Sequence, residues 1–237
     1  MRWRWRTSRR YENQALDYWS AALMRIRAAS EMPPSSIPRS LQHSSLNSRM
    51  NLPRLILASA SPRRAELLRN LGLKFRVVPS EAIEVRHEQL TARELSQLNA
   101  YRKARAVAKK IPDALVVGAD TLVCFGSRLF GKPTNLDEAE RMISQLQGRT
   151  HQVVTGVCLI HLRRFRQKIF VETTDVTFRP LDRKQIRYYL KAIHPLDKAG
   201  AYAIQVRGDL IVEKVAGSFS NVVGLPVERL QTELQSW

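Results

Sequence analysis

Short apolar runs alternate with amphipathic stretches after residue 50, and this alternation predicts an α/β protein. The apolar runs predict the first strands at residues 55–58, 74–78 and 114–117. Helix start and stop residues lie between and after these runs. They predict helices at residues 61–72, 91 to about 110, 135–148, about 183–193, and after Pro226.

Local capping signals support three of these helices. Ser61, Pro62 and Gly72 supply an N-cap, a first turn and a left-handed C-terminal cap for the first of them. Pairs with capping-box spacing open the next two, namely Thr91 with Glu94 and Asn135 with Glu138. One apolar stripe of the helix at 135–148 is expected to face inward, and it consists of Leu136, Ala139, Met142, Ile143 and Leu146.

The second half of the chain is richer in strand patterns. Residues 152–162 and 169–178 are long β-type runs separated by a basic turn, which predicts an antiparallel hairpin inside a mixed sheet. Another strand is expected at residues 210–215. Residues 217–226 are rich in turn formers and hydroxyls, so a loop is expected there, either wrapping a sugar or phosphate or simply connecting two elements.

Charge separates the chain near Met50. The formal net charge of the 237 residues is +18, which favours polyanions such as nucleotides or nucleic acid as partners. Residues 1–49 contribute +6 through nine Arg and three acids, so the remainder carries +12 and is basic by itself. We therefore predict a basic, disordered extension at 1–49 and one folded domain at 50–237.

The extension has several interpretations. Its Arg/Trp alternation at residues 2–6 and its Ser/Pro/Arg-rich tract at 30–49 suit an arm that binds nucleic acid or a membrane surface. An Arg-rich transit peptide is another interpretation. We favour a third, a start codon assigned too far upstream, because the sequence around Met50 resembles a natural beginning.

Other compositional features restrict the class of protein. Cys124 and Cys158 lie in apolar runs without metal-type spacing, which predicts free thiols and a reducing cytoplasm. No apolar stretch approaches the roughly 20 residues that span a bilayer. The chain lacks a Walker loop and a Gly-x-Ser-x-Gly elbow. The scattered histidines, His151, His161 and His194, are interpreted as structural.

The start of the first helix is a candidate anion site. First-turn amides have no partners inside a helix, and the helix dipole is positive there. Arg63 and Arg64 add two cations where the dipole alone would favour acids, so an anion that offsets them is expected. The alternative is a basic first turn that is simply solvated.

Further candidate chemistry lies near turns. Asp120 follows an apolar strand, where α/β folds often place functional carboxylates, although a carboxylate that caps a turn is the alternative. Lys132, between Gly131 and Pro133, suits a phosphate oxygen or a solvated loop. Gln205 offers both a donor and an acceptor for the edge of a nucleobase.

Several motifs together resemble the Maf family of nucleoside triphosphate pyrophosphatases across residues 52–230. They are Ser59-Ala-Ser-Pro-Arg-Arg64, Gly118-Ala-Asp-Thr121, Gly131-Lys-Pro133, residues 148–156, residues 197–205 and residues 220–226. The resemblance implies an elongated mixed β-sheet with flanking helices, in two lobes around a central cleft, related to the inosine triphosphate pyrophosphatases. It also implies hydrolysis of a triphosphate to monophosphate and pyrophosphate, with Mg²⁺ or Mn²⁺. The segment at 197–205 resembles the branch that acts on dTTP and UTP.

The resemblance also implies roles for single residues. Asp120 matches the proton acceptor, and Arg63, Thr121 and Gln205 match positions tied to substrate choice. The other substrate-binding positions implied are Ser59, Ser61, Arg64, Lys103, Lys132, Asp197 and Lys198. Glu84 and Asp120 are the expected metal ligands. The chain departs from the family pattern in the spread acids around Glu84 and in Val206, where glycine is usual.

Alternative functions remain open at this stage. The substrate could instead be 7-methyl-GTP or an inosine-type triphosphate. A nucleic-acid-binding regulator of septum formation is the competing class, although basic residues without interleaved aromatic residues disfavour a platform for single strands. A homodimer, a nucleotide substrate, no nucleic acid and no membrane partner are the expected associations.

Overall fold

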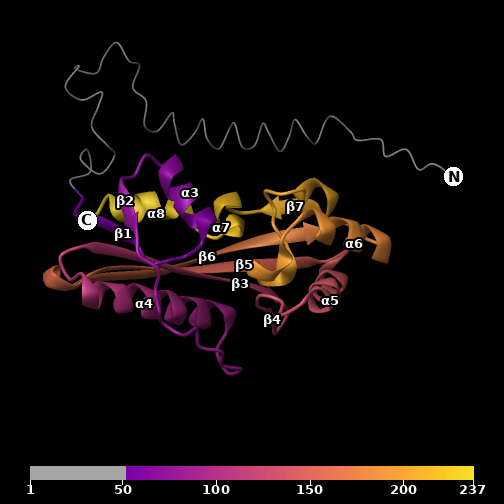
Figure 1. The fold of residues 1–237 in the computed structure, drawn as a ribbon, viewed down its shortest axis with the longest axis horizontal. Helices are drawn as coiled ribbons and strands as arrows, with labels where there is room; N and C mark the ends of the chain where they lie inside the picture. Colours follow the sequence, from indigo (N-terminus) through magenta and orange to yellow (C-terminus); the bar gives the residue numbers. More distant parts are fainter. Residues whose placement is uncertain (1–51) are drawn as a thin grey trace, which may run out of the picture. The chain divides into compact units, whose positions relative to one another are not determined.

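The computed structural model describes residues 52–237 and shows a mixed sheet with helices on both faces (Figure 1). The seven strands run in the order β2-β1-β3-β5-β6-β7, and β4 pairs with β3 outside this path. Their bounds are β1 Leu55–Leu57, β2 Phe75–Val77, β3 Leu115–Phe125, β4 Arg128–Phe130, β5 Thr150–His161, β6 Arg166–Phe178 and β7 Val212–Ala216. The predicted mixed α/β class is confirmed.

The helices follow the predicted local signals. They are α3 Pro62–Asn70, α4 Ala92–Lys110, α5 Leu136–Leu146, α6 Arg183–Ala192, α7 Phe219–Val223 and α8 Val227–Leu234. Short 3₁₀ turns are η3 Leu162–Arg164, η4 Pro195–Asp197, η5 Ala199–Ala201 and η6 Gly208–Leu210. Thr91 and Glu94 form the predicted capping box, and Gly72 has φ +70° in the predicted left-handed position.

Strand length creates a free edge in the sheet. β1 pairs in parallel with β3 only as far as Val117, whereas β4 joins the same edge of β3 from Val123 onward. Between these two pairings, β3 is bonded to β5 alone, and Asp120 lies opposite Gly156. Within residues 52–237, the backbone of β3 at Ala119 and Thr121 therefore has no strand partner on that side.

Helix α4 packs on one face of the sheet, and α3, α7 and α8 lie over the other (Figure 1). Two glycines allow α4 to approach closely. A Cβ at Gly118 would lie 2.4 Å from the Ala100 carbonyl oxygen, and a Cβ at Gly156 would lie 2.4 Å from the Ser96 carbonyl oxygen. This close approach brings the polar side chains of α4 to the free edge of β3.

Hydrophobic clusters lie along β3 on either side of the polar pair Asp120 and Thr121. One cluster joins α4 to Val116 and to Cys158 of β5. Another joins Val123 to α5 and α6. The polar pair falls between them, which agrees with the expected two lobes around a cleft.

The structure corrects several predictions about elements. β3 continues to Phe125, so Asp120 lies inside a strand rather than after one; it is buried, and β1 does not reach that part of β3. Leu136 was predicted to face inward but is 59% exposed, since it is the first residue of α5. The predicted loop at 217–226 contains α7, which Ser218 caps, and β4 was not predicted. Short elements carry too few periodic residues to be recognised.

Other predictions can be compared directly. Cys124 and Cys158 are buried and free, as expected. Within the described part of the chain, no helix is long and apolar enough to cross a membrane. The predicted extension at 1–49 and its boundary at Met50 lie outside the described residues, so they stay predictions.

Candidate functional site

A cavity of about 370 Å³ opens at the free edge of β3. This volume falls in the range of pockets that hold small ligands, roughly 300–1,000 Å³. Every site residue predicted above lines it: Ser59, Ser61, Arg63, Arg64, Glu84, Lys103, Asp120, Thr121, Lys132, Asp197, Lys198 and Gln205. The fold thus brings into one pocket side chains that are far apart in the sequence.

Arg64 is bound entirely to neutral oxygens in the described part of the chain. Its Nε donates to the Gly224 carbonyl oxygen at 2.8 Å, Nη1 to Ser59 Oγ at 3.2 Å, and Nη2 to Thr121 Oγ1 at 2.9 Å. Burial lowers the pKa of this guanidinium, and the Asp120 charge opposes that shift. A partly buried cation without a carboxylate in contact favours an anionic ligand.

The start of α3 leaves its amides available. Ser61 occupies the predicted N-cap position with Pro62 next, but its side chain makes no capping hydrogen bond. Ser59 Oγ instead accepts from the Ser61 amide at 3.2 Å. Because the first-turn amides are not capped by a side chain, they can bind an anion beside Arg64.

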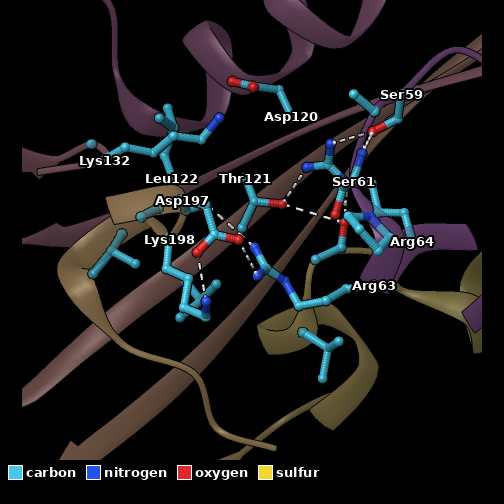
Figure 2. Close-up of a pocket in the computed structure, with 18 of the residues that line it drawn as sticks. Ser59, Ser61, Arg63, Arg64, Asp120, Thr121, Leu122, Lys132, Asp197 and Lys198 are labelled. Atoms are coloured by element: carbon cyan, nitrogen blue, oxygen red, sulfur yellow. Dashed lines mark hydrogen bonds and ion pairs between the residues drawn. The ribbon is translucent and has the colours of Figure 1, made fainter. Parts of the chain in front are cut away.

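Thr121 holds Arg64 in place. Its hydroxyl accepts from Arg64, lies 3.0 Å from the Thr155 hydroxyl and lies 3.3 Å from the Gly224 carbonyl oxygen. Thr155 is fully buried, and its hydroxyl also lies 3.3 Å from the Asn221 carbonyl oxygen. The Thr121 hydroxyl therefore contacts Arg64 directly (Figure 2), and the Thr155 hydroxyl holds it from the other side.

Asp120 faces α4. Lys103 Nζ lies 2.6 Å from Asp120 Oδ1 and 2.6 Å from Glu84 Oε1. Asn99 donates to Asp120 Oδ2 at 3.3 Å and binds both the amide and the carbonyl of Val85. One oxygen of the buried Asp120 carboxylate thus contacts the Lys103 ammonium, and the other accepts from the Asn99 side-chain amide.

Glu84 joins the same cluster from the loop after β2. Its partial burial would raise the pKa of its carboxyl group, but the hydrogen bond and charge of Lys103 outweigh burial and hold that pKa below its ordinary value. The charges of Lys132 and Arg64 act in the same direction. Glu84 is therefore present as a carboxylate at neutral pH.

Arg63 and Asp197 meet across the pocket (Figure 2). Arg63 Nη1 lies 3.0 Å from Asp197 Oδ2, and Lys198 Nζ binds the other carboxylate oxygen as well as the His194 carbonyl. Burial would raise the pKa of Asp197, but Lys198 and Arg63 outweigh it and lower that pKa. The buried Lys198 ammonium is thus already occupied by protein oxygens, while Arg63 keeps further donors toward the cavity.

Uncharged side chains line the pocket as well. They include Leu122, Tyr202, Ala203 and Gln205. Lys132 also lines the cavity, and its side chain forms no hydrogen bond or ion pair to another described residue. The cavity therefore combines several cations with apolar and amide side chains.

Two carboxylates of the pocket are the candidate ligands for a metal ion. Glu84 and Asp120 are two carboxylates that converge on one point, presently contacted by Lys103. Among residues 52–237, no group of three His, Cys, Asp or Glu side chains is placed to hold a metal ion. Two carboxylates fit Mg²⁺ or Mn²⁺ when substrate oxygens complete the coordination.

Three residues that shape the site were not identified from the sequence. Asn99, Thr155 and Tyr189 are buried and hold other site residues through hydrogen bonds. Asn99 had a usable signal, since Ser96, Asn99 and Lys103 place polar side chains at helical spacing on one face of α4. Thr155 lies in the motif at 148–156, although no role was assigned to it. Tyr189 had no signal, because it occupies an ordinary core position of a helix.

The fold and the site define an α/β protein with a basic pocket next to paired carboxylates. The chain belongs to the Maf family, since the family described as Maf-like protein matches residues 54–237.

Named relatives cover most of the chain. A Carboxydothermus hydrogenoformans protein named dTTP/UTP pyrophosphatase is 44% identical over 184 residues, covering 78% of this chain and 98% of that protein. One of the same name from Bacillus velezensis is 44% identical over 184 residues, with 78% and 96% covered. Another, from Symbiobacterium thermophilum, is 46% identical over 175 residues, with 74% and 89% covered.

Proposed function

We propose that this protein hydrolyses nucleoside triphosphates to the monophosphate and pyrophosphate, and that dTTP and UTP are its substrates. One observation carries the proposal: Arg63, Arg64 and Lys132 line the same cavity as Asp120. The printed names of relatives that share 44% of residues over nearly their full length support the same activity and the same nucleotides.

Substrate binding follows from the charge distribution. The phosphate chain lies against Arg63, Arg64 and Lys132 and against the free amides at the start of α3. Arg64 is preorganised by its three neutral acceptors, so little side-chain entropy is lost when an anion arrives. The nucleoside then extends toward Tyr202, Ala203 and Gln205, which line the same cavity, and Gln205 recognises the base through its amide donor and acceptor.

A divalent cation, Mg²⁺ or Mn²⁺, belongs to the proposal. Glu84 and Asp120 would hold it together with phosphate oxygens, and it would supply neutralisation of the phosphate charge and polarisation of the reacting phosphorus. Lys103 contacts both carboxylates and keeps them together before substrate binds.

Asp120 is assigned to the proton transfer. Its carboxylate orients a water molecule for in-line attack on the α-phosphorus and accepts a proton from that water. A bond forms from the water oxygen to phosphorus as the bond to the bridging oxygen breaks, and pyrophosphate leaves with that oxygen. Asn99 holds Oδ2 throughout, which limits rotation of the carboxylate.

A nucleotide panel tests the proposal. The full chain is incubated with dTTP, UTP, CTP, GTP, ITP and 7-methyl-GTP, each with Mg²⁺ or Mn²⁺, and pyrophosphate release is measured. We expect fastest release from dTTP and UTP. Faster release from 7-methyl-GTP or ITP would contradict the substrate assignment. Salt-sensitive DNA binding without turnover would replace the enzyme with the nucleic-acid-binding alternative.

The wider setting is part of the proposal. We expect the protein to act in the cytoplasm on the nucleotide pool, where removal of non-standard nucleotides is useful. A homodimer and the absence of a nucleic-acid partner stay predictions. Light scattering tests the first, and a DNA-binding assay tests the second.

A further inference from the structure

The segment from Asp197 to Gln205 contributes several residues to the pocket and lies outside the strands of the sheet. It begins with the last residue of η4 and continues through η5 into a turn, and both Gly200 and Ala201 have positive φ, at +68° and +63°. A positive φ at an alanine is an unfavourable conformation that surrounding contacts must maintain. The segment therefore depends on neighbouring elements for its shape.

Tyr189 of α6 supplies one of these contacts. Its hydroxyl donates to the Ala203 carbonyl oxygen at 3.1 Å and accepts from the Ala203 amide at 2.9 Å. Tyr189 is fully buried, and burial raises the pKa of its phenol, so the hydroxyl keeps the proton that it donates. One side-chain oxygen thus takes the place of a neighbouring strand for both polar groups of Ala203.

Ala203 is the first residue of the turn that carries Gln205. The Val206 amide donates to the Ala203 carbonyl oxygen at 3.4 Å, which closes a turn with Gln205 in its third position. Ala203 and Gln205 both line the cavity. Holding Ala203 therefore sets where the turn begins and how the Gln205 side chain enters the pocket.

We infer that Tyr189 is a positioning residue for substrate selection: through Ala203, it orients Gln205 and the pocket wall against the nucleobase. Tyr189 itself does not line the cavity, so its effect reaches the substrate only through the backbone that it holds. This inference rests on the proposed function, in which Gln205 recognises the base.

The variant Tyr189→Phe removes only the hydroxyl oxygen. The Ala203 amide then loses its partner in a buried setting, while the carbonyl keeps the longer bond to Val206. We expect kcat/KM for dTTP and UTP to fall about five-fold and kcat/KM for GTP to change less than two-fold. The preference for dTTP and UTP over GTP should therefore become smaller.

A matched control separates positioning from loss of stability. Ile186 lies on the same helix, is 2% exposed and belongs to the same hydrophobic cluster, but it does not line the cavity. Ile186→Val should lower the melting temperature by a few degrees and keep the wild-type ratio of dTTP to GTP activity. An equal narrowing of the ratio in Ile186→Val would overturn the inference.

Two further measurements complete the test. An unchanged ratio of dTTP to GTP activity in Tyr189→Phe overturns the inference. Gln205→Ala in the same assay shows whether recognition of the base by Gln205 is also wrong. If Gln205→Ala narrows the ratio and Tyr189→Phe does not, only the role of Tyr189 is wrong. In the wild-type protein, the Ala203 amide should exchange slowly with solvent; exchange as fast as at exposed turn residues also overturns the inference.

Discussion

Asp120 and Thr121 are neighbours in β3, so their side chains point to opposite faces of the sheet, and both line the same pocket (Figure 2). Asp120 Oδ1 lies 2.6 Å from Lys103 Nζ on α4, and Thr121 Oγ1 lies 2.9 Å from Arg64 Nη2 on α3. Both line the cavity that opens where β1 ends at Leu57 and leaves the edge of β3 free. One dipeptide therefore connects the proposed base with the phosphate-binding arginine.

Replacement of Asp120 by Asn tests the proposed base. The amide keeps the size of the side chain but cannot accept the proton, so turnover of dTTP should fall by a factor on the order of 10² to 10⁴. Lys103 keeps Glu84 as its partner, so the fold should persist. Pyrophosphate release and thermal unfolding check both expectations. Near-normal turnover in this variant would rule out the role assigned to Asp120.

The Glu84→Gln variant tests the proposed metal site. Loss of one carboxylate should raise the Mg²⁺ concentration for half-maximal activity about ten-fold, with activity largely recovered at saturating metal. Glu81→Gln is the control from the same loop, because the Glu81 side chain is 83% exposed and pairs with Lys110. Equal metal requirements in the two variants would contradict the assignment of Glu84.

Thr121→Val tests the support of Arg64. Valine matches the shape of threonine but removes the acceptor for Arg64 Nη2 and the contact with Thr155. We expect KM for dTTP to rise about ten-fold, which corresponds to about 1.4 kcal/mol, a typical value for a hydrogen bond to a charged group. Thr121→Ser keeps the hydroxyl and should restore most of the affinity. A normal KM in the valine variant would show that Arg64 does not need this contact.

Gln205→Ala tests base recognition. The amide offers a donor and an acceptor to a base edge, so its loss should lower kcat/KM for dTTP and UTP about ten-fold and that for purine nucleotides much less. The comparison of substrates within one variant controls for protein concentration and stability. A uniform loss across all nucleotides would contradict recognition of the base at this position.

His151 predicts a pH dependence of stability. Burial lowers its pKa to about 4, with the Asp175 charge opposing, and its Nε2 lies 3.0 Å from the Tyr202 hydroxyl. Below about pH 6.5 the unfolded chain binds a proton that the folded state excludes. The stabilisation that comes from keeping His151 neutral is fully present above pH 6.5. It decreases as the pH falls toward 4, and the slope of the free energy of unfolding approaches about 1.4 kcal/mol per pH unit.

Denaturant unfolding between pH 6.5 and 5 measures this slope. That window lies above the range in which Glu84 and Asp197, whose pKa values are lowered, take up protons. His151→Gln can still bind the Tyr202 hydroxyl but does not titrate, so its slope should be much smaller. A wild-type slope in this variant would show that another group controls acid stability.

Local signals in the sequence predicted most of the fold. The capping box at Thr91 and Glu94, the glycine cap at Gly72 and the alternation in the β5–β6 hairpin are properties of neighbouring residues, so they are visible without tertiary structure. The predictions were wrong where an element is short, as in α7, or where a strand continues past a polar dipeptide, as in β3.

The candidate site was predictable in part. Its motif residues were all identified, and the structure places them around one cavity. The contacts that organise them were not predictable: Asn99 on Asp120, Thr155 on Thr121 and Tyr189 on Ala203. Each of these contacts joins residues that are 14 or more positions apart, and no spacing rule links them.

By itself, the sequence determined the order of strands and helices, the basic charge and the set of chemically competent side chains, because these depend on composition and on spacing along the chain. Only the tertiary structure decided that the side chains of Asp120 and Thr121 lie on opposite faces of the sheet, that Arg64 binds neutral oxygens, and that Tyr189 holds the backbone of Ala203. The physical reason is that burial and hydrogen bonding between distant segments arise only when the sheet, its early-ending strand and the packed helices are assembled.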